Sequence, residues 1–586
     1  MAVLAVASAV FLGCILSPPA LTDDVDAVQA QIARNMLDSG DWVTARLDGI
    51  AYLEKSPLKY WLIALSYKAF GVHDWVARLP VAISAVVLCW LAFRIGAWAF
   101  SVRAGLYVGL ILATCVGLFL FTRFQIPDVT VTATISLAMW SFLRALDPEE
   151  QRQGLWASIM AAAIGAGLLL KGLIAAVFPI AGALLFLAFT GELWSRDAWR
   201  KLHVARGLVI ALAVAAPWHV LATLRNPPYF DLTLHSAPGE YRGFFWFYFM
   251  NEHVLRFLNL RYPRDYNTVP RLYFWLFHLL WLFPWSVYFP AVAKLGFRPV
   301  DRAGRMRLLC LCWTGFLLLF FTFSSTQEYY SMPCYPALAL LIASAMAGSE
   351  RGVFRFERIV LIGIASAAAL VILGILVSVW NLPAPGDISQ ALAQQDPNAY
   401  TLSLAHMGDL TLASFAYLKP PLMLASIACV LGAALIWRAP VAGAVVMMVL
   451  LVHAARLAQV VFDPYLSSRP LADALNRAPA GTLILDDQYY TFSSVVFYAE
   501  AYHKKRILLL NGRVNNLEYG SYAPDAPQDV FIDDPGFRDR WLSPNLYYIC
   551  VEQPQVQRLR KLVGPEALHT VIESGGKVVL SNQPVI

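Results

Sequence analysis

The sequence predicts a mainly helical membrane protein with a small α/β domain at its C-terminal end, and three observations lead to this fold class. Hydrophobic residues make up 59% of the 586 residues, charged residues make up 14%, and the mean hydropathy is +0.57. A soluble domain carries about 25% charged residues. Long apolar runs follow one another up to residue 460, and after residue 461 short β-rich runs and charged helical stretches replace them.

The apolar runs are long enough to cross a membrane as helices, which takes about 20 residues each. About thirteen such runs are predicted, at 1–18, 79–100, 104–122, 128–146, 156–171, 172–191, 206–223, 270–293, 308–325, 331–348, 359–380, 419–437 and 440–460. The first run lacks the basic segment of a signal peptide, so we expect a retained helix. The stretch around Lys171-Gly172 either breaks into two helices or continues as one.

The charges in the loops predict the orientation of the chain. One set of loops is basic, which places it in the cytoplasm; its cations are Arg94, Arg103, Arg196, Arg200, Lys201, Arg206, Lys294, Arg298, Arg302, Arg305, Arg307, Arg351, Arg355, Arg358 and Arg438. The other set is mixed or acidic and is expected to face outside, which is the periplasm in a Gram-negative cell. It comprises 19–78, 123–127, 224–269, 326–330, 381–418 and the residues after 461. The two sets alternate along the whole chain if Lys171-Gly172 is an outer turn.

The C-terminal part is predicted to be a separate α/β domain. Strands are expected at Thr482–Asp486, Arg506–Leu510, Leu546–Val551 and Lys577–Leu580, and a helix at Gln555–Leu562. This length allows an independent core. We therefore divide the chain into a transmembrane part, 1–460, and a soluble periplasmic domain, 461–586. The domain contains no glycine-rich phosphate-binding motif, and the eight scattered cysteines form no disulfide pattern.

The first outer loop carries an unusual number of ionisable groups. Asp23, Asp24 and Asp26 follow the first apolar run, and Glu54-Lys55 precedes the second. Ionisable groups at the edge of a bilayer cost energy and are usually retained for function. The three aspartates also stand at the start of a predicted helix, where the helix dipole favours carboxylates. Helix capping and catalysis therefore both remain open for them.

Two helices are predicted within this loop. Residues 26–37 are amphipathic, with Val28, Ile32 and Met36 on one stripe, and Gly40 ends the helix. We expect this helix to lie on the membrane surface with the stripe toward the lipid. A second interfacial helix follows Lys55; its apolar residues are Leu58, Trp61, Leu62 and Leu65.

Further polar residues lie in or next to apolar runs of the same outer face. Asp128 opens a span after Pro127, where it either caps the helix or faces the same cavity as the first loop. Lys171 lies deep in an apolar run, where it snorkels to the surface, pairs with a carboxylate or binds an anion. Tyr330 lies in a short polar turn between spans, where its hydroxyl binds a head group or marks the interface.

The aromatic block 241–257 contains three polar residues that an interfacial location alone does not explain. They are Glu252, His253 and Arg256. His253 and Arg256 are three residues apart, so they share one face of a helix. A cation and an imidazole among aromatic rings fit the phosphate end of a lipid.

Several motifs resemble a known family. In chain order they lie at 33–44 (Ala-Arg-Asn-Met-Leu-x-Ser-Gly-Asp-Trp-Val-Thr), 52–57 (Tyr-Leu-Glu-Lys-Ser-Pro), 70–72 (Phe-Gly-Val) and 78–80 (Arg-Leu-Pro), with further matches at 170–172, 217–218, 252–257, 282–285 and 330–338. They resemble the bacterial aminoarabinose transferases of the ArnT type, which belong with the protein O-mannosyltransferases among the GT-C-fold membrane glycosyltransferases. The resemblance covers all the spans.

This resemblance implies an inverting glycosyltransferase that uses a polyprenyl phosphate sugar, with undecaprenyl phosphate as the lipid, and transfers the sugar to an acceptor on the outer face. The family's catalytic base is an aspartate of the first outer loop. An ungapped alignment from Glu54 places it on Val25, so the base is expected to be Asp24 or Asp26. The family's second acidic position falls on Asp128.

The resemblance also implies binding roles. Lys55 corresponds to the lysine on the donor phosphate. Arg256, Lys171 and Tyr330 are further candidates for that phosphate, because a leaving phosphate needs positive charge and hydrogen-bond donors. A divalent metal ion (Zn²⁺, Mg²⁺ or Mn²⁺) is implied between Glu54 and His253.

Two departures concern the substrates. The family's arginine-tyrosine pair falls on Val28-Gln29, and a lysine of the polar turn is replaced near Glu328. The substrates of ArnT therefore cannot be assumed, and the acceptor is left open among a lipid A-like lipid, another lipid or glycan, and a protein hydroxyl.

Two other classes of function compete with the glycosyltransferase. A transporter or flippase for a lipid-linked sugar would also suit thirteen spans, but such proteins carry internal repeats and charges at the membrane midplane. The sequence shows no internal repeat, and its charges gather at one face. A structural or assembly protein is the third class, which the Glu-Lys and Glu-His motifs make less favourable.

Overall fold

The computed structural model describes residues 1–263, 268–348, 354–393 and 409–585. Within these ranges nine helices are long and apolar enough to cross a membrane. They are α4 (Asp74–Ala99), α7 (Asp128–Leu146), α8 (Gln153–Lys171), α10 (Arg196–Leu202) with α11 (Val204–Arg225), α15 (Arg302–Phe323), the turn Glu328–Cys334 with α16 (Tyr335–Gly348), α17 (Arg355–Val379), α18 (Lys419–Arg438) and α19 (Pro440–Leu466). The chain is a multi-pass membrane protein.

The predicted number of about thirteen spans is not confirmed. Three of the predicted runs are shorter apolar helices, namely Ala2–Leu12, α5 (Val102–Thr114) and α9 (Ile174–Phe189). A fourth is a pair of helices, α13 (Arg271–Trp281) and Trp285–Val292, bent by 98°. Counting this pair as one span gives up to ten spans among the described residues. Hydropathy measures the length of an apolar run but not the backbone breaks inside it.

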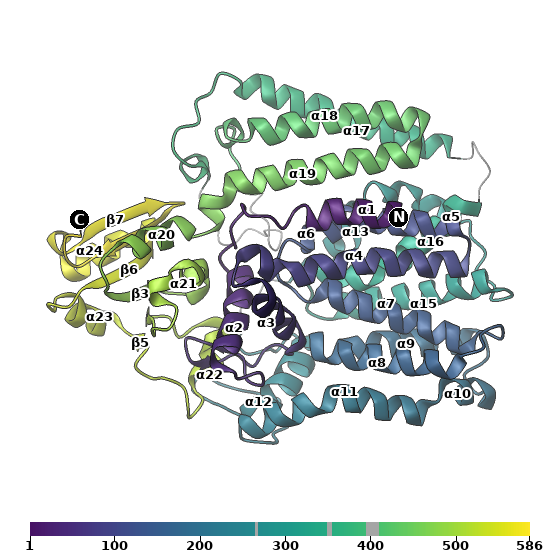
Figure 1. The fold of residues 1–586 in the computed structure, drawn as a ribbon, viewed down its shortest axis with the longest axis horizontal. Helices are drawn as coiled ribbons and strands as arrows, with labels where there is room; N and C mark the ends of the chain where they lie inside the picture. Colours follow the sequence, from purple (N-terminus) through teal and green to yellow (C-terminus); the bar gives the residue numbers. More distant parts are fainter. Residues whose placement is uncertain (264–267, 349–353, 394–408, 586) are drawn as a thin grey trace.

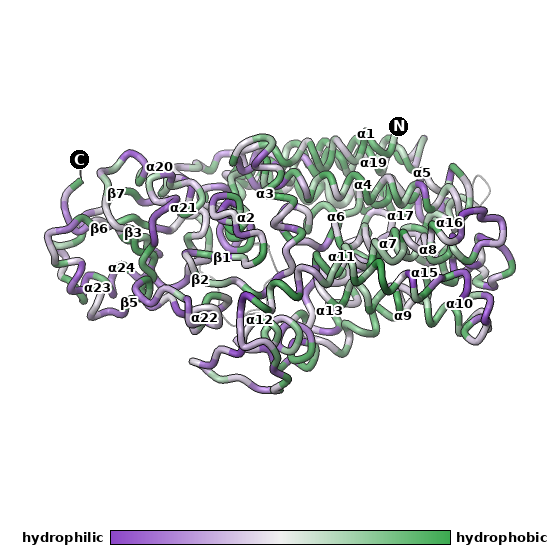
Figure 2. Tube along the Cα trace, turned by 60° about the horizontal axis from the view of Figure 1, so that its bottom comes forward, coloured by the Kyte–Doolittle hydropathy of each residue, from purple (hydrophilic) through white to green (hydrophobic). Residues whose placement is uncertain are grey.

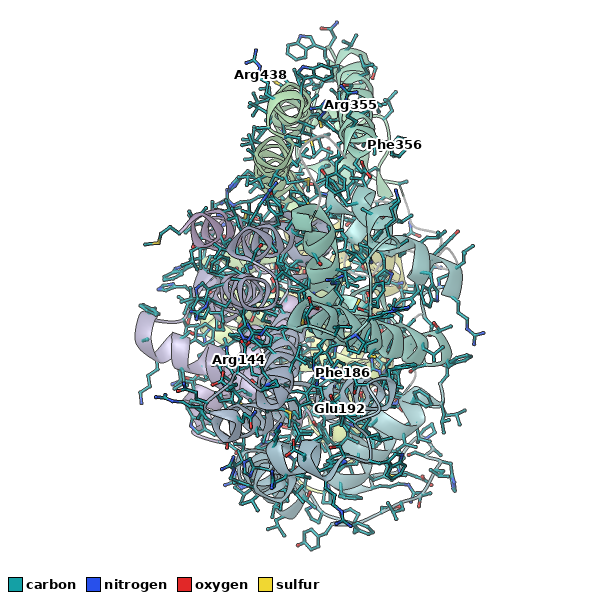
Figure 3. All side chains as sticks on the ribbon, turned by 90° about the vertical axis from the view of Figure 1, so that its right-hand side faces the viewer. Arg144, Phe186, Glu192, Arg355, Phe356 and Arg438 are labelled. Atoms are coloured by element: carbon teal, nitrogen blue, oxygen red, sulfur yellow. The ribbon has the colours of Figure 1, made fainter. Side chains whose placement is uncertain are left out.

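The helices connect two opposite ends of the molecule, which we call the domain end and the basic end. The C-terminal domain lies at the domain end, and the loops predicted to be cytoplasmic lie at the basic end (Figure 1). Figure 3 looks onto the basic end, where Arg144, Glu192, Arg355 and Arg438 are labelled, and there α17–α19 project from the main bundle. Figure 2 shows hydrophobic residues along the helices, with hydrophilic residues in the C-terminal domain and in the loops of the basic end.

The helix break predicted as one alternative at Lys171-Gly172 is confirmed. Helix α8 ends at Lys171, Gly172 has a φ of +69°, and α9 begins at Ile174. The turn lies at the domain end (Figure 1). This position completes the alternation of basic loops and mixed loops that the sequence predicts.

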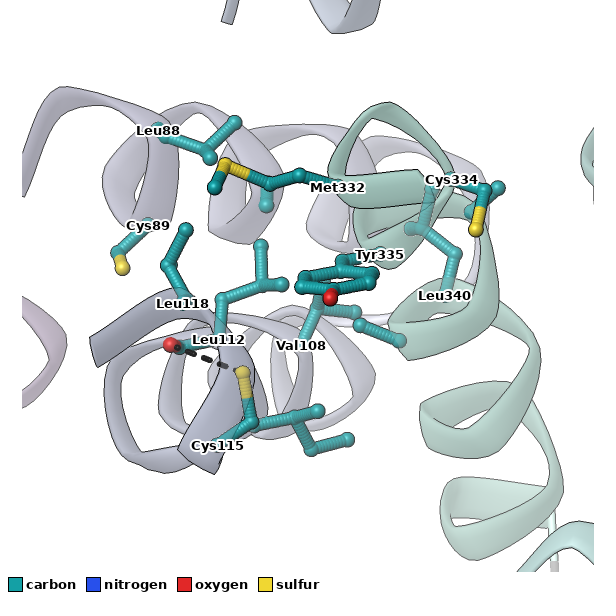
Figure 4. Close-up of a cluster of buried hydrophobic side chains, with 14 of the residues drawn as sticks. Leu88, Cys89, Val108, Leu112, Cys115, Leu118, Met332, Cys334, Tyr335 and Leu340 are labelled. Carbon is teal, nitrogen blue, oxygen red and sulfur yellow. Dashed lines mark hydrogen bonds between the residues drawn. The ribbon is translucent and has the colours of Figure 1, made fainter. Parts of the chain in front are cut away.

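The core of the bundle is built from small and branched apolar side chains on neighbouring helices. Figure 4 shows Leu88 and Cys89 of α4, Val108 of α5, Leu118 of α6 (Val116–Phe121) and Tyr335 of α16 in one buried cluster. All eight cysteines of the chain are buried and none forms a disulfide.

The C-terminal domain contains a six-stranded sheet in the order β5-β4-β3-β6-β8-β7. Its strands are β3 (Thr482–Asp486), β4 (Leu508–Leu510), β5 (Phe531–Ile532), β6 (Tyr547–Glu552), β7 (His569–Ser574) and β8 (Lys577–Ser581). Strands β5, β4, β3 and β6 are parallel, and β8 is antiparallel to β6. The helices are α20 (Arg469–Arg477), α21 (Ser493–Tyr498), α22 (Asn515–Ser521), α23 (Asp534–Trp541) and α24 (Val556–Val563). The predicted small α/β domain is confirmed.

The apolar runs of β3 and β6 are continuous because both faces of the sheet are buried. Leu485 and Cys550 face one core cluster, and Ile484 and Ile549 face a second one on the other side. The alternation of neighbouring residues between the two clusters follows from the period of two in a strand.

Both predicted helices of the first outer loop are present, but one of them faces a different partner than we expected. They are α2 (Val25–Ser39), which ends at Gly40 with a φ of +70°, and α3 (Leu58–Phe70); a hairpin of β1 (Arg46–Leu47) and β2 (Ile50–Ala51) lies between them. The stripe of Val28, Ile32 and Met36 belongs to the same core cluster as Leu485 of the C-terminal sheet. The prediction that this stripe faces the lipid is therefore wrong, because an apolar stripe shows that a partner exists but not which one.

Candidate functional site

A cavity of about 1390 Å³ opens at the domain end, between the first outer loop, the helix bundle and the C-terminal sheet. It brings together nearly all of the residues that the sequence singled out. Those that line it are Asp23, Asp24, Glu54, Lys55, Asp128, Lys171, Glu252, His253, Arg256 and Tyr330. The cavity has an apolar side as well, lined by side chains of α9 and α15 among others.

Asp24 and Asp26, the two candidates for the catalytic base, have different surroundings in the structure. Asp24 is exposed and lines the cavity, and its side chain makes no capping hydrogen bond to α2. Asp26 is only 1% exposed and lies outside the residues that line the cavity. Its carboxylate pairs with Arg78 at 3.0 Å and accepts a hydrogen bond from the backbone N–H of Thr22 at 3.2 Å. Asp26 is therefore part of the fold, and Asp24 is the carboxylate that faces the cavity.

The backbone of Asp24 is held in an uncommon conformation by the C-terminal domain. Its φ is 68° and its ψ is −137°, a region that costs energy for a residue with a side chain. The N–H of Asp24 donates to the carbonyl of Tyr490 at 2.9 Å, and its carbonyl accepts from the hydroxyl of Ser493 at 3.2 Å. Strain of this kind is retained where the surrounding structure over-determines it, and it is common at functional sites.

A group of cations surrounds the buried carboxylate of Glu54. Lys55 forms an ion pair with it, and guanidinium nitrogens of Arg256 and Arg261 lie 3.9 Å and 4.0 Å from the same oxygen. Burial alone would raise the pKa of Glu54, but the three cations outweigh burial and hold the pKa below its ordinary value. Arg256 and Arg261 also pair with Glu252, and Arg256 donates to the hydroxyl of Tyr330 at 2.9 Å.

A further cation, Lys171, lies beside the same tyrosine. Lys171 forms an ion pair with Asp128, which was one of the alternatives considered for this lysine. Its ammonium lies 4.7 Å from the centre of the Tyr330 ring. Cation–π contacts of this length are favourable. Lys55, Arg256 and Lys171 thus reach one cavity from three different chain segments, which makes them candidates for binding an anion together.

Both ring nitrogens of His253 are hydrogen-bonded to backbone groups, so neither is available to a metal ion in this arrangement. Its Nδ1 donates to the carbonyl of Tyr248 at 2.6 Å, and its Nε2 accepts from the backbone N–H of Leu173 at 3.1 Å. Burial lowers the pKa of His253, which keeps the ring neutral. Glu54 is already surrounded by cations. Among the described residues, no three acidic, histidine or cysteine side chains gather as metal ligands. The residues present do not fit the implied metal ion, and no step is derived through one.

Gly172 lets His253 approach the α8–α9 turn. A Cβ at Gly172 would lie 2.2 Å from Nε2 of His253 and 2.8 Å from the hydroxyl of Tyr248. We expect Gly172→Ala to lower the free energy of unfolding by about 1–3 kcal/mol more than Gly191→Ala does, because overpacking adds to the shared backbone cost. Gly191 is the matched control, since its φ of +72° is similar and no atom lies within 4 Å of its Cβ position. Thermal unfolding of the two purified variants tests this, and equal losses would contradict it.

Comparisons with known proteins match this geometry. Residues 54–220 match the family described as Dolichyl-phosphate-mannose-protein mannosyltransferase. The crystal structure of ArnT from Cupriavidus metallidurans bound to undecaprenyl phosphate superposes with a TM-score of 0.78 at 22% identity, covering 99% of this chain and 97% of that one. The apo structure of the same protein gives a TM-score of 0.76. The chain has the GT-C fold of ArnT.

Two curated sequence relatives are similar over a shorter part of the chain. The undecaprenyl phosphate-α-4-amino-4-deoxy-L-arabinose arabinosyl transferase of Pectobacterium atrosepticum is 28% identical over 326 residues, and the protein of that name from Pseudomonas aeruginosa is 29% identical over 329 residues. Each alignment covers 54% of this chain and 54% of the relative. The chain thus spans about half the length of the curated relatives it matches.

Residues that the sequence did not single out also lie in this cavity or next to it. Arg261 completes the cations around Glu54, and its side chain is 1% exposed. Lys59 of α3 donates to Gln29 of α2 at 2.6 Å, and burial lowers the pKa of Lys59. Arg261 lies in an irregular segment after the aromatic block, so no periodicity marks it. The sequence identified Gln29 only as a departure from the family's motif. In the structure its side-chain oxygen accepts the hydrogen bond from Lys59.

Proposed function

We propose that this protein is an inverting glycosyltransferase of the cell inner membrane that transfers a sugar from a polyprenyl phosphate, with undecaprenyl phosphate as the lipid, to an acceptor on the periplasmic face. One observation carries the proposal: Asp24 shares a cavity with the cationic group of Lys55, Arg256 and Lys171. The ArnT structure bound to undecaprenyl phosphate and the names of the curated relatives support the choice of lipid.

The residues have separate roles in the proposed reaction. Lys55, Arg256 and Lys171 hold the donor phosphate, with the hydroxyl of Tyr330 as a further donor, and they stabilise the charge that develops on it. Asp24 accepts the proton of the acceptor hydroxyl as that oxygen attacks the anomeric carbon. The bond between the anomeric carbon and the phosphate oxygen breaks, and its electron pair leaves with the polyprenyl phosphate. A single displacement inverts the anomeric configuration.

Asp128 has a supporting role in this scheme. Its ion pair with Lys171 fixes the ammonium above the ring of Tyr330, next to the place proposed for the phosphate. The lipid tail of the donor lies along the apolar side of the cavity, which includes Ile174, Val177 and Phe320. We also propose the division into a catalytic transmembrane part, 1–460, and a periplasmic domain, 461–586, because the basic loops that the structure describes lie at the end opposite that domain.

The test is consumption of the donor by purified protein. In lipid nanodiscs with a lipid extract of its own host, the protein is expected to release undecaprenyl phosphate and to add one sugar mass to one acceptor class, both read by mass spectrometry. A flippase in the same nanodiscs would leave the donor intact, since nothing separates two compartments there. An intact donor after prolonged incubation would therefore overturn the proposed transferase in favour of a transporter.

A further inference from the structure

The C-terminal sheet presents its topological switch point to the cavity. From β3 the chain continues to β4 and β5 on one side, whereas β6 pairs with the opposite side of β3. In open sheets of parallel strands, ligands bind in the crevice outside the carboxyl ends of the two strands at which the order reverses. Residues directly after β3, Gln488 and Tyr490, line the cavity together with Glu552, the last residue of β6.

A hairpin closes this crevice on its other side. Strands β7 and β8 are joined by Gly575-Gly576, which have φ values of +63° and +76°, as a tight two-residue hairpin requires. The N–H of Gly575 donates to Asp387 at 3.1 Å, and a Cβ at Gly575 would lie 1.8 Å from the carbonyl oxygen of Pro464. Both glycines line the cavity. The hairpin is therefore seated on the end of α19 and forms a fixed wall.

The crevice differs in charge from the opposite side of the cavity. Its cation, Lys577, has an ion pair with Asp23 at 2.6 Å and donates to the carbonyl of Thr491 at 2.7 Å and to Ser468 at 3.1 Å, which uses its three donors. An anion entering the cavity is attracted instead to the cationic group of Lys55, Arg256 and Lys171, which reaches the cavity from the helix bundle and the outer loops.

The polar groups that the crevice presents suit hydroxyl groups. Gln488 and Asn515 provide amides that bond to one another at 2.6 Å, Tyr490 donates to the hydroxyl of Tyr52 at 3.0 Å, and Glu552 provides a carboxylate. Amides, hydroxyls and a carboxylate offer both donors and acceptors to a sugar or polyol. Leu418, which precedes α18, also lines the cavity, together with Ala455, Ala458 and Phe462 of α19.

We infer that the switch-point crevice binds the acceptor, and that this acceptor is a lipid with a neutral, polyhydroxylated head group. The inference rests on the proposed function for the reaction itself. The head group lies against the crevice, with one hydroxyl directed toward Asp24, and the tail follows α19. The donor phosphate occupies the cationic group on the other side, so the two lipids approach Asp24 from different walls.

Photolabelling of the full-length protein in nanodiscs free of glycoside detergent tests this arrangement. The two probes are a dodecyl glucoside with a diazirine on its glucose and a dodecyl phosphate with a diazirine next to its phosphate. We expect the glucoside to label 486–492 and 574–577, and undecaprenyl phosphate not to displace it. We expect the phosphate probe to label the outer-loop and bundle segments around Lys55 and Arg256, and undecaprenyl phosphate to displace it. Labelling of the crevice by the phosphate probe, or no labelling of it by the glucoside, would overturn the inference.

Variants of the crevice sharpen the test. Gln488→Ala and Glu552→Gln are expected to lower the yield of glucoside labelling roughly tenfold, which corresponds to the loss of one hydrogen bond, without changing the binding of undecaprenyl phosphate. Glu573→Gln is the matched control, because Glu573 is exposed on β7 outside the cavity lining. Unchanged labelling of both crevice variants would also overturn the inference.

The two proposals fail in different ways. If the wild-type protein does not bind undecaprenyl phosphate but the glucoside labels the crevice, the proposed donor falls and the glycolipid crevice stands. If undecaprenyl phosphate binds and the glucoside labels only the bundle side, the crevice assignment falls and the proposed transferase stands.

Discussion

Asp24→Asn is expected to lower the rate of sugar transfer roughly 10²–10⁴-fold, the contribution that a positioned general base makes. The amide keeps the size of the side chain and cannot accept the proton of the acceptor hydroxyl. Because Asp24 is exposed in the cavity and the amide has nearly the same shape, the variant should fold and should still bind undecaprenyl phosphate. Release of undecaprenyl phosphate from the donor, followed by mass spectrometry, measures the rate.

Asp26→Asn serves as the contrasting variant, since it changes the same chemical group two residues away. Its removal leaves the buried guanidinium of Arg78 without its carboxylate partner, and breaking a buried pair in this way costs about 3–5 kcal/mol. We therefore expect a larger loss of thermal stability for Asp26→Asn than for Asp24→Asn. A stable, inactive Asp26→Asn together with a fully active Asp24→Asn would reverse the two roles.

The sequence predicted local structure well where one segment determines it. The helix of the first outer loop, its end at Gly40 and the break at Lys171-Gly172 each follow from a short pattern, and the structure contains all three. The β-rich runs of the C-terminal part were recognisable because both faces of the sheet are apolar. What the α2 stripe packs against was not recognisable, because Val28 and its core partner Leu485 lie far apart in the chain.

The charged part of the site was also predictable from local sequence. Charged residues next to apolar runs are conspicuous, so the cations and carboxylates of the cavity stood out before the fold was known. The sequence alone does not distinguish Asp24 from Asp26, because the difference between them depends on Arg78, which pairs with Asp26. No sequence pattern marked the crevice residues Gln488 and Tyr490, because their position at the crevice depends on the parallel pairing of strands β3 and β6.

For the metal ion, the expectation from the resemblance disagrees with the contacts that Glu54 and His253 make in the structure. The resemblance implies an ion between Glu54 and His253, and the structure brings both residues to one cavity. The surroundings, however, are cationic around Glu54, and both ring nitrogens of His253 bond to backbone groups. In this chain His253 links the aromatic block to the turn after Lys171, so it positions that lysine.

Lys55→Ala is expected to weaken the binding of undecaprenyl phosphate by roughly 10–100-fold, the effect of losing one charge-assisted hydrogen bond to a phosphate. Arg256 and Lys171 still attract the anion, so binding weakens but persists. The fold should tolerate the change, because Arg256 and Arg261 remain within 4.0 Å of Glu54 and keep its carboxylate compensated.

Titration of the purified variants with undecaprenyl phosphate in nanodiscs measures this effect. Lys68→Ala is the matched control, since Lys68 lies on α3 in the same outer loop but is exposed and lies outside the cavity lining. Equal affinities of Lys55→Ala and wild type would show that the ion pair with Glu54 fully occupies the ammonium. The donor phosphate would then belong to Arg256 and Lys171 alone, and the doubly substituted Arg256→Ala, Lys171→Ala protein would have to lose binding completely.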